Sequence, residues 1–134
     1  MIQEHKNTRT QEHQILTYKD QVKSKLDQFV QDVYRFSKQF PKEELYGVTS
    51  QLRRAALSVV LNYIEGFARR RPLVQLNFLE ISYGSLQESK YLLEFALKVC
   101  YLKQSEFDRA HTQADEIGAM LWSEIQALDK SVHG

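Results

Sequence analysis

The chain has 134 residues, of which 43% are hydrophobic and 26% charged, and its formal net charge is +1. This length suits one domain with one core, and the composition excludes a wholly disordered chain and a polycation. Two prolines and five glycines are too few for the many turns of an all-β fold.

The N-terminal segment, residues 1–18, carries neither a packing pattern nor a targeting signal. Residues 1–14 are polar, without helical periodicity and without the apolar core of a signal peptide. We expect a flexible arm or a short lead-in to the first helix, with Ile15, Leu16 and Tyr18 at its end. No apolar run approaches the ~18 residues of a membrane span. One cysteine, Cys100, rules out an internal disulfide and favours a cytoplasmic location.

Four helices are predicted in residues 19–131. The first runs from about Lys19 to Phe40 and ends before Pro41, because the residue before a proline is disfavoured in the α conformation. The second spans about residues 49–70, the third runs from about 72 to 100, and the fourth starts near Ser105. We expect Ser105 to cap the fourth helix, and Gly47 to take the positive φ of a tight turn.

Apolar residues recur three and four positions apart in every predicted helix, which is typical of one buried helical face. The main stripes contain Val22, Leu26, Phe29, Val33 and Phe36; Leu52, Ala55, Ala56, Val59, Tyr63 and Phe67; Leu76, Leu79, Tyr83, Leu86, Leu93 and Leu97; and Ala110, Ala114, Ile117, Leu121, Ile125 and Leu128. The connections are short, which favours antiparallel neighbours. The sequence therefore predicts an all-α, antiparallel up-down-up-down four-helix bundle.

A second apolar strip on the second helix lies away from its core stripe and contains Leu57, Leu61 and Ile64. Contiguous exposed apolar patches usually mark interfaces, so we predict an oligomer or partner interface here. The alternative is that the N-terminal arm covers the strip within one subunit.

Three glycines, Gly66, Gly84 and Gly118, fall inside predicted helices, where each costs about 1 kcal/mol relative to alanine. They indicate either a bend or ligand approach, or close helix–helix contact; we favour close contact.

The equipment of an enzyme is not apparent. A di-iron bundle needs inward carboxylates on all four helices and two Glu-x-x-His motifs, whereas the chain has one approximation, Asp108 with His111. Cys100 lies among apolar residues, and we expect a small buried hydrophobe rather than a nucleophile. There is no glycine-rich phosphate loop. We therefore expect no catalytic residues, no metal and no cofactor.

Positive charge gathers between residues 45 and 75, which hold five arginines and one glutamate, while the rest of the chain is slightly acidic. Arginines clustered on one element can contact nucleic-acid phosphates. The alternative is a solvated surface with scattered ion pairs. The predicted nucleic-acid-binding residues are Arg53, Arg54, Arg69, Arg70 and Arg71.

The stretch from Phe40 to Ala56, with Glu65-Gly66, Arg69-Arg70, residues 84–88 and residues 115–118, resembles the four-helix-bundle protein family, also known as the intervening-sequence proteins of bacterial 23S ribosomal RNA. The resemblance covers about residues 22–128. It implies a small bacterial bundle, a homo-oligomer with five subunits, and a link to nucleic acid. A related branch, the accessory variability proteins of diversity-generating retroelements, binds a reverse transcriptase and its template RNA.

The second helix departs from the family pattern Ile-Pro-Ser-Asn-Ile-Ala-Glu-Gly. It lacks the proline and places Leu61 and Ile64 where the family has serine and alanine. A straighter helix with a more apolar outer face is expected. We predict a non-enzymatic, homo-oligomeric scaffold that binds structured RNA or other nucleic acid, with an accessory subunit for a partner protein such as a reverse transcriptase as the alternative.

Overall fold

The structure is a computed structural model, and it describes residues 17–134. Within this part of the chain, four α-helices and one short 3-10 helix follow one another: α2 (Tyr18–Ser37), η1 (Lys42–Glu44), α3 (Val48–Ala68), α4 (Pro72–Lys98) and α5 (Gln104–His133). Thr17 caps α2 by accepting a hydrogen bond from the backbone N–H of Asp20 at 3.1 Å.

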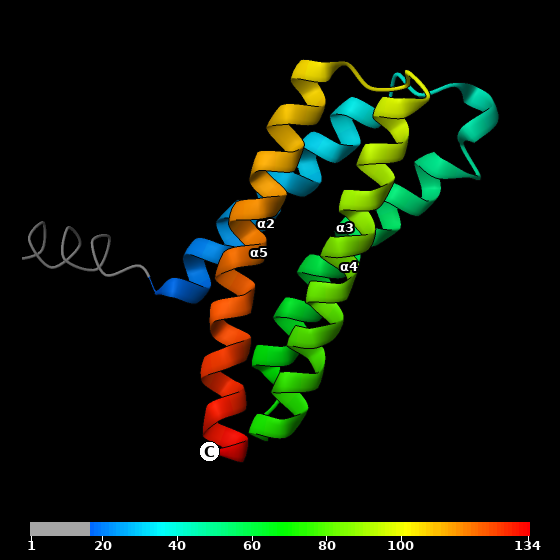
Figure 1. The fold of residues 1–134 in the computed structure, drawn as a ribbon. Helices are drawn as coiled ribbons and strands as arrows, with labels where there is room; N and C mark the ends of the chain where they lie inside the picture. The colour runs from blue at the N-terminus through cyan, green and yellow to red at the C-terminus, as the bar shows by residue number, and fades with distance from the viewer. Residues whose placement is uncertain (1–16) are drawn as a thin grey trace, which may run out of the picture.

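The four helices form an antiparallel bundle, which confirms the predicted fold class (Figure 1). α2 packs against α3 and α5, and α4 packs against the same two helices, so the cyclic order is α2, α3, α4, α5. α2 has 20 residues, nearly as many as α3, but it starts well above the end of the bundle where α5 ends and α4 begins (Figure 1).

The predicted stripes form the core. Fully buried side chains include Leu26, Phe29, Leu52, Tyr63, Leu79, Leu86, Leu93, Ile117 and Leu121. Polar side chains are also buried in this core. Ser82 of α4 donates a hydrogen bond from Oγ to the Val59 carbonyl of α3 at 2.6 Å, which ties the two helices together at mid-length.

The first helix ends earlier than predicted. α2 stops at Ser37, and two residues beyond it make tighter bonds: the N–H groups of Gln39 and Phe40 donate to the carbonyls of Phe36 and Ser37 at 3.4 and 3.1 Å. Such i to i−3 bonds are a common way to satisfy the last carbonyls of a helix. The chain is therefore already leaving α geometry before Pro41.

The left-handed residue also differs from the prediction. Gly47 has a φ of −113°, whereas Cys100 has a φ of 65°. Cys100 ends α4: its N–H donates to the Leu97 carbonyl at 3.1 Å and the Tyr101 N–H donates to the Ala96 carbonyl at 2.8 Å, the bond pattern of a Schellman motif. Cys100 is exposed, so its prediction as a buried hydrophobe is wrong, because a residue in this cap position turns outward from the helix end.

The cap of the fourth helix also needs correction. Ser105 lies inside α5, whose N-cap residue is Lys103. The Glu106 carboxylate accepts a hydrogen bond from the Lys103 backbone N–H at 3.0 Å. Glu106 therefore plays the part assigned to Ser105, by reaching back across the first turn.

The three glycines inside helices differ in whether another side chain occupies the space where a Cβ would lie. A Cβ on Gly66 would lie 3.2 Å from the Phe78 Cβ, and one on Gly118 would lie 3.4 Å from a Leu86 methyl. Close helix contact is therefore confirmed at Gly66 and Gly118. A Cβ on Gly84 would meet nothing within 4 Å among the described residues, so the same explanation is wrong for Gly84.

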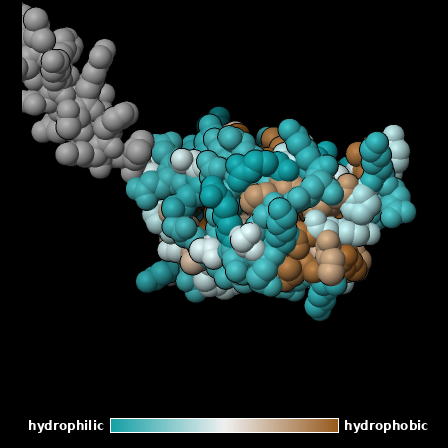
Figure 2. All heavy atoms as spheres, turned by 90° about the horizontal axis from the view of Figure 1, so that it is seen from above, coloured by the Kyte–Doolittle hydropathy of each residue, from teal (hydrophilic) through white to brown (hydrophobic). Residues whose placement is uncertain are grey.

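The end of the bundle that carries the α2–α3 and α4–α5 connections is mostly hydrophilic, with hydrophobic residues gathered on one side (Figure 2). None of the helices in residues 17–134 is long and apolar enough to cross a membrane.

Candidate nucleic-acid interface

The five predicted arginines form two groups rather than one patch. Arg53 and Arg54 lie in the second turn of α3, and Arg69, Arg70 and Arg71 form the turn between α3 and α4. Fifteen residues separate Arg54 from Arg69, which corresponds to about 22 Å along the helix axis. One subunit therefore offers two separate sites of positive charge.

Arg53 is held by α2. Its Nε donates to Ser37 Oγ at 2.8 Å, its Nη2 lies 3.5 Å from the Tyr34 carbonyl oxygen, and its guanidinium stands 4.8 Å from the centre of the Tyr34 ring. The side chain is half-buried. These contacts use Arg53 to join α3 to α2, and they leave only part of the guanidinium for a ligand.

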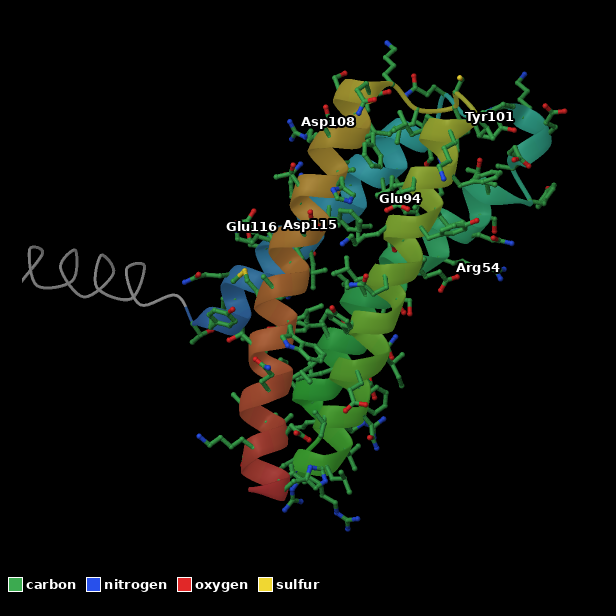
Figure 3. The ribbon with its side chains drawn as sticks, viewed as in Figure 1. Arg54, Glu94, Tyr101, Asp108, Asp115 and Glu116 are labelled. Carbon is green, nitrogen blue, oxygen red and sulfur yellow. The ribbon has the colours of Figure 1, made fainter. Side chains whose placement is uncertain are left out.

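Arg54 points outward from α3, away from α5 (Figure 3). It makes no hydrogen bond or ion pair with any residue in the described part of the chain. The two neighbouring arginines therefore differ in kind, since one is a packing residue and the other is open to solvent.

Arg69 is engaged within its own turn. It pairs with Glu65, one helical turn earlier, and its guanidinium lies 5.2 Å from the centre of the Phe78 ring on α4. The Arg69 carbonyl accepts a hydrogen bond from Gln75 Nε2 at 2.6 Å. These contacts fix the course of the chain between α3 and α4.

Arg70 and Arg71 are exposed, and neither has an ion-pair partner within residues 17–134. With Ala68, Arg69 and Val74 they line a shallow hollow of about 300 Å³. Arg71 is the N-cap residue of α4, whose first turn contains no acidic side chain. The positive end of the α4 dipole therefore adds to the charge of the two arginines, and this end of the bundle suits an anion.

The predicted interface strip on α3 exposes two of its three side chains to solvent. Leu61 is 59% exposed and Ile64 is 43% exposed, while Leu57 is half-buried. Tyr18 does not cover this strip, because its hydroxyl reaches α5 and donates to the Met120 carbonyl at 3.3 Å. Ile15 and Leu16, the other residues considered as a cover, lie outside the described residues.

A buried carboxylate joins α2 to α5. Asp32 is 0% exposed and accepts hydrogen bonds from Arg109 Nε at 3.0 Å and Gln113 Nε2 at 2.7 Å, while Arg35 lies 2.9 Å away. Burial alone would raise the pKa of Asp32, but the bonds from Gln113 and Arg109 and the charges of Arg109 and Arg35 outweigh it and hold that pKa below its usual value.

A second polar pair crosses the core and joins the buried Tyr63 to the half-buried Glu124. Tyr63 of α3 donates its hydroxyl proton to Glu124 of α5 at 2.6 Å. Burial raises the pKa of the Glu124 carboxyl, and the hydrogen bond from Tyr63 and the charge of Lys19 only partly offset this. Burial and the neighbouring carboxylate also raise the pKa of Tyr63.

Glu124 borders a groove of about 300 Å³ at the end of the bundle that α2 does not reach. The groove is lined by Phe67 of α3, Leu79 of α4 and Leu128 of α5, among others. We call it the open-corner groove. Lys19, in the first turn of α2, stands 4.9 Å from the centre of the Phe67 ring at its edge.

The residues considered for catalysis and metal binding have ordinary partners. Asp108 accepts a hydrogen bond from Gln104 at 2.9 Å, and His111 lies 3.3 Å from Asp115. No group of three or more metal-ligating side chains occurs in the described ranges.

Two comparisons with known proteins find a match, one to a protein family and one to a solved structure. A family model described as 23S rRNA-intervening sequence protein matches residues 19–123. A crystal structure of a protein of unknown function from the S23 ribosomal protein family of Bacteroides thetaiotaomicron VPI-5482 is similar, with a TM-score of 0.76 and 22% identity over 82% of this chain and 99% of that one. At this identity, the likeness shows the fold alone. The comparison with curated proteins finds no match.

Proposed function

We propose that this chain, which belongs to the 23S rRNA-intervening sequence protein family, is a non-enzymatic, homo-oligomeric scaffold that binds structured RNA or another nucleic acid. The observation that carries the proposal is the pair Arg70 and Arg71, exposed and without ion-pair partners in the described chain, at the acid-free start of α4. Arg54 supplies a second contact on the outer face of α3.

Binding of this kind is weakly sequence-specific. Exposed arginines and a helix N-terminus contact phosphates, which position a nucleic acid without reading its bases. Phosphate contacts release counterions, so affinity falls steeply as salt rises. Self-association strengthens the effect, because symmetry repeats each arginine group in every subunit.

The test reverses the charge of the exposed Arg70 and Arg71 and leaves Arg69, whose contacts fix the turn, unchanged. Arg70→Glu with Arg71→Glu should abolish binding to a structured RNA in a filter or anisotropy assay, with the melting temperature unchanged. Lys23→Glu with Lys130→Glu is the matched control, because both lysines are exposed and lie on α2 and α5. Wild-type affinity in the Arg70/Arg71 variant would show that the arginine turn is not the site.

Self-association is proposed through the strip of Leu57, Leu61 and Ile64, with five subunits as the resemblance implies. Large apolar side chains exposed together are the supporting observation. Light scattering should give a multiple of 15.7 kDa, and Leu61→Ser with Ile64→Ala should lower that mass while the subunit stays folded. Leu73→Ser, at an exposed leucine on α4, should leave the mass unchanged. A wild-type monomer would refute the proposal.

The second candidate is an accessory subunit whose partner is a protein such as a reverse transcriptase. The open-corner groove favours it, because three helices there present Phe67, Leu79 and Leu128, and α2 contacts only the edge of the groove, through Lys19 on the Phe67 ring. A partner helix could complete such a corner. Co-purification with a reverse transcriptase encoded beside the gene, lost in Leu128→Glu, would support this role; co-purification unaffected by Leu128→Glu would exclude the groove as the site.

A further inference from the structure

A pocket of about 400 Å³ lies where α2 passes through η1 into α3, on the opposite end of α3 from the arginine turn. Its cationic lining residues are Lys38, Lys42 and Arg53, and no carboxylate lines it. Phe40, Pro41 and Leu45 supply an apolar part of the wall. Three positive charges around a partly apolar pocket suit a ligand that is anionic at one end.

The start of α3 at this pocket lacks a cap. Gly47 is the N-cap residue and has no side chain to accept a hydrogen bond, and the first turn contains no acidic residue. The backbone N–H groups of Val48, Thr49 and Ser50 make no hydrogen bond to any residue within 17–134. Free N–H groups at the positive end of a 21-residue helix are a favourable environment for an anion.

Thr49 gives a second, independent indication of a ligand. Its side chain lines the pocket and the residue is only 3% exposed, yet its hydroxyl has no hydrogen-bond partner in the described chain. Among residues 17–134 the fully buried side-chain atom without a partner is Gln113 Oε1, so the Thr49 hydroxyl oxygen opens into the pocket, where a ligand can bond to it.

Two carboxylates lie near the start of α3, but neither lines the pocket. Glu44 places its Oε1 close to the Gly47 backbone and interacts with the Tyr101 hydroxyl on the α4–α5 side. Glu43 is exposed on η1. Neither lines the pocket, so the cations in the pocket remain available to a ligand.

We propose that this pocket binds one phosphate monoester group, with the phosphate at Thr49 and the α3 N-terminus and with a base or sugar against Phe40, Pro41 and Leu45. Lys42 and Lys38 compensate the charge, and Arg53 contributes the part of its guanidinium that α2 does not use. The phosphate belongs to a free mononucleotide or to the 5′ end of an RNA. Arg70 and Arg71 do not line this pocket, so phosphate binding here can be tested separately from nucleic-acid binding at the arginine turn.

The experiment is a titration of the full ¹⁵N-labelled chain, followed by amide NMR. Adenosine 5′-monophosphate at millimolar concentration should shift the amides of Val48, Thr49 and Ser50 in a saturable manner, inorganic phosphate should shift the same amides, and adenosine should not. Lys42→Gln and Thr49→Val should each weaken binding about tenfold, as expected for losing one hydrogen bond to a charged group.

The controls separate this site from the arginine turn and from unfolding. Lys23→Gln, at an exposed lysine on α2, should leave the titration unchanged, as should Arg70→Glu with Arg71→Glu. Lys42 is exposed, so its variant stays informative if Thr49→Val fails to fold. An RNA with a 5′ phosphate that competes when its 5′-hydroxyl form does not would identify an RNA end as the source; competition by neither, with mononucleotide binding intact, would identify the free nucleotide. Equal shifts with adenosine and its monophosphate, or no loss in Lys42→Gln, would overturn the proposal.

Discussion

The α2–α5 interface and the α3–α4 turn both carry arginines, but the two regions use them in opposite ways. At the interface, Arg109 and Arg35 converge on the buried Asp32. At the turn, Arg70 and Arg71 face solvent with no carboxylate beside them in the described chain. Charge counted along a sequence therefore does not measure charge available to a ligand, because a single buried carboxylate decides which arginines are already occupied.

Removing the Asp32 carboxylate should change the free energy of unfolding more than any other substitution considered for these two regions. Asp32→Ala leaves Arg109, Arg35 and Gln113 without their shared acceptor and should lower the free energy of unfolding by about 3 kcal/mol, measured in urea. Asp27→Ala, at an exposed aspartate on the same helix, should change it by less than about 0.5 kcal/mol. A small effect at Asp32 would mean that the interface rests on apolar packing alone.

The same variant makes a prediction about pH. The pKa of Asp32 is lowered in the folded state from its usual value of 3.8. Its contribution to stability is therefore complete above that value and is lost as the pH falls through the folded pKa. The difference between wild type and Asp32→Ala should shrink in acid; a constant difference would contradict this linkage.

The contrast between occupied and open positions extends to glycines. Gly66→Ala forces a methyl against the Phe78 Cβ and the Gln75 carbonyl, at 3.2 and 3.4 Å, and should destabilise the protein by about 1 kcal/mol despite better helix propensity. Gly84→Ala meets empty space and should stabilise it by about 1 kcal/mol. Thermal unfolding measures both. Destabilisation at Gly84 would show that a second molecule approaches α4 there.

Arg53 and Arg54 allow the same comparison, between an arginine with partners and one without partners in the described chain, at two adjacent residues. Arg53→Gln removes the bond to Ser37 and the contact with the Tyr34 ring, and should lower the free energy of unfolding by about 1 kcal/mol. Arg54→Gln should leave it within about 0.5 kcal/mol. Equal effects would show that the contacts of Arg53 to α2 do not contribute to stability.

Substitution of Glu124 should have the smallest effect on stability, and the pH dependence of that effect should be opposite to that of Asp32. Its pKa is raised in the folded state from its usual value of 4.5, so ionisation opposes folding and stability is lost as the pH rises from that value through the folded pKa. Glu124→Gln should therefore be more stable than wild type at neutral pH and lose that advantage in acid. Greater stability of wild type at neutral pH would mean that the Tyr63–Glu124 bond outweighs the cost of burial.

The helices and their core faces could be predicted from the sequence because apolar spacing reports directly on a buried face. The loss of α geometry before Pro41 and the left-handed cap at Cys100 could not, since both depend on how the last carbonyls find donors. Asp32 did leave a signal: it lies three residues after Phe29 and four before Phe36, on the apolar stripe.

The candidate sites were less accessible to sequence reasoning. The sequence shows the five arginines as a local excess of charge, but their separation into two groups and the use of Arg53 by α2 depend on which helix lies opposite. The pocket at the start of α3 combines residues from two helices and their connection. Its main indication, the unpaired hydroxyl of Thr49, exists only once the fold has buried that residue.

The position at which α2 starts along α5 also has a consequence for motion. Tyr18 reaches α5 at Met120, so α5 continues for about 20 Å beyond the start of α2, with α4 as the helix packed against it there in the described chain. Fewer buried contacts mean cheaper local opening. Amide hydrogens of residues 126–133 should therefore exchange with solvent deuterium much faster than those of residues 110–121. Local opening would widen the open-corner groove without unfolding the rest, which makes this end of the bundle the place where a partner could be admitted at the least energetic cost.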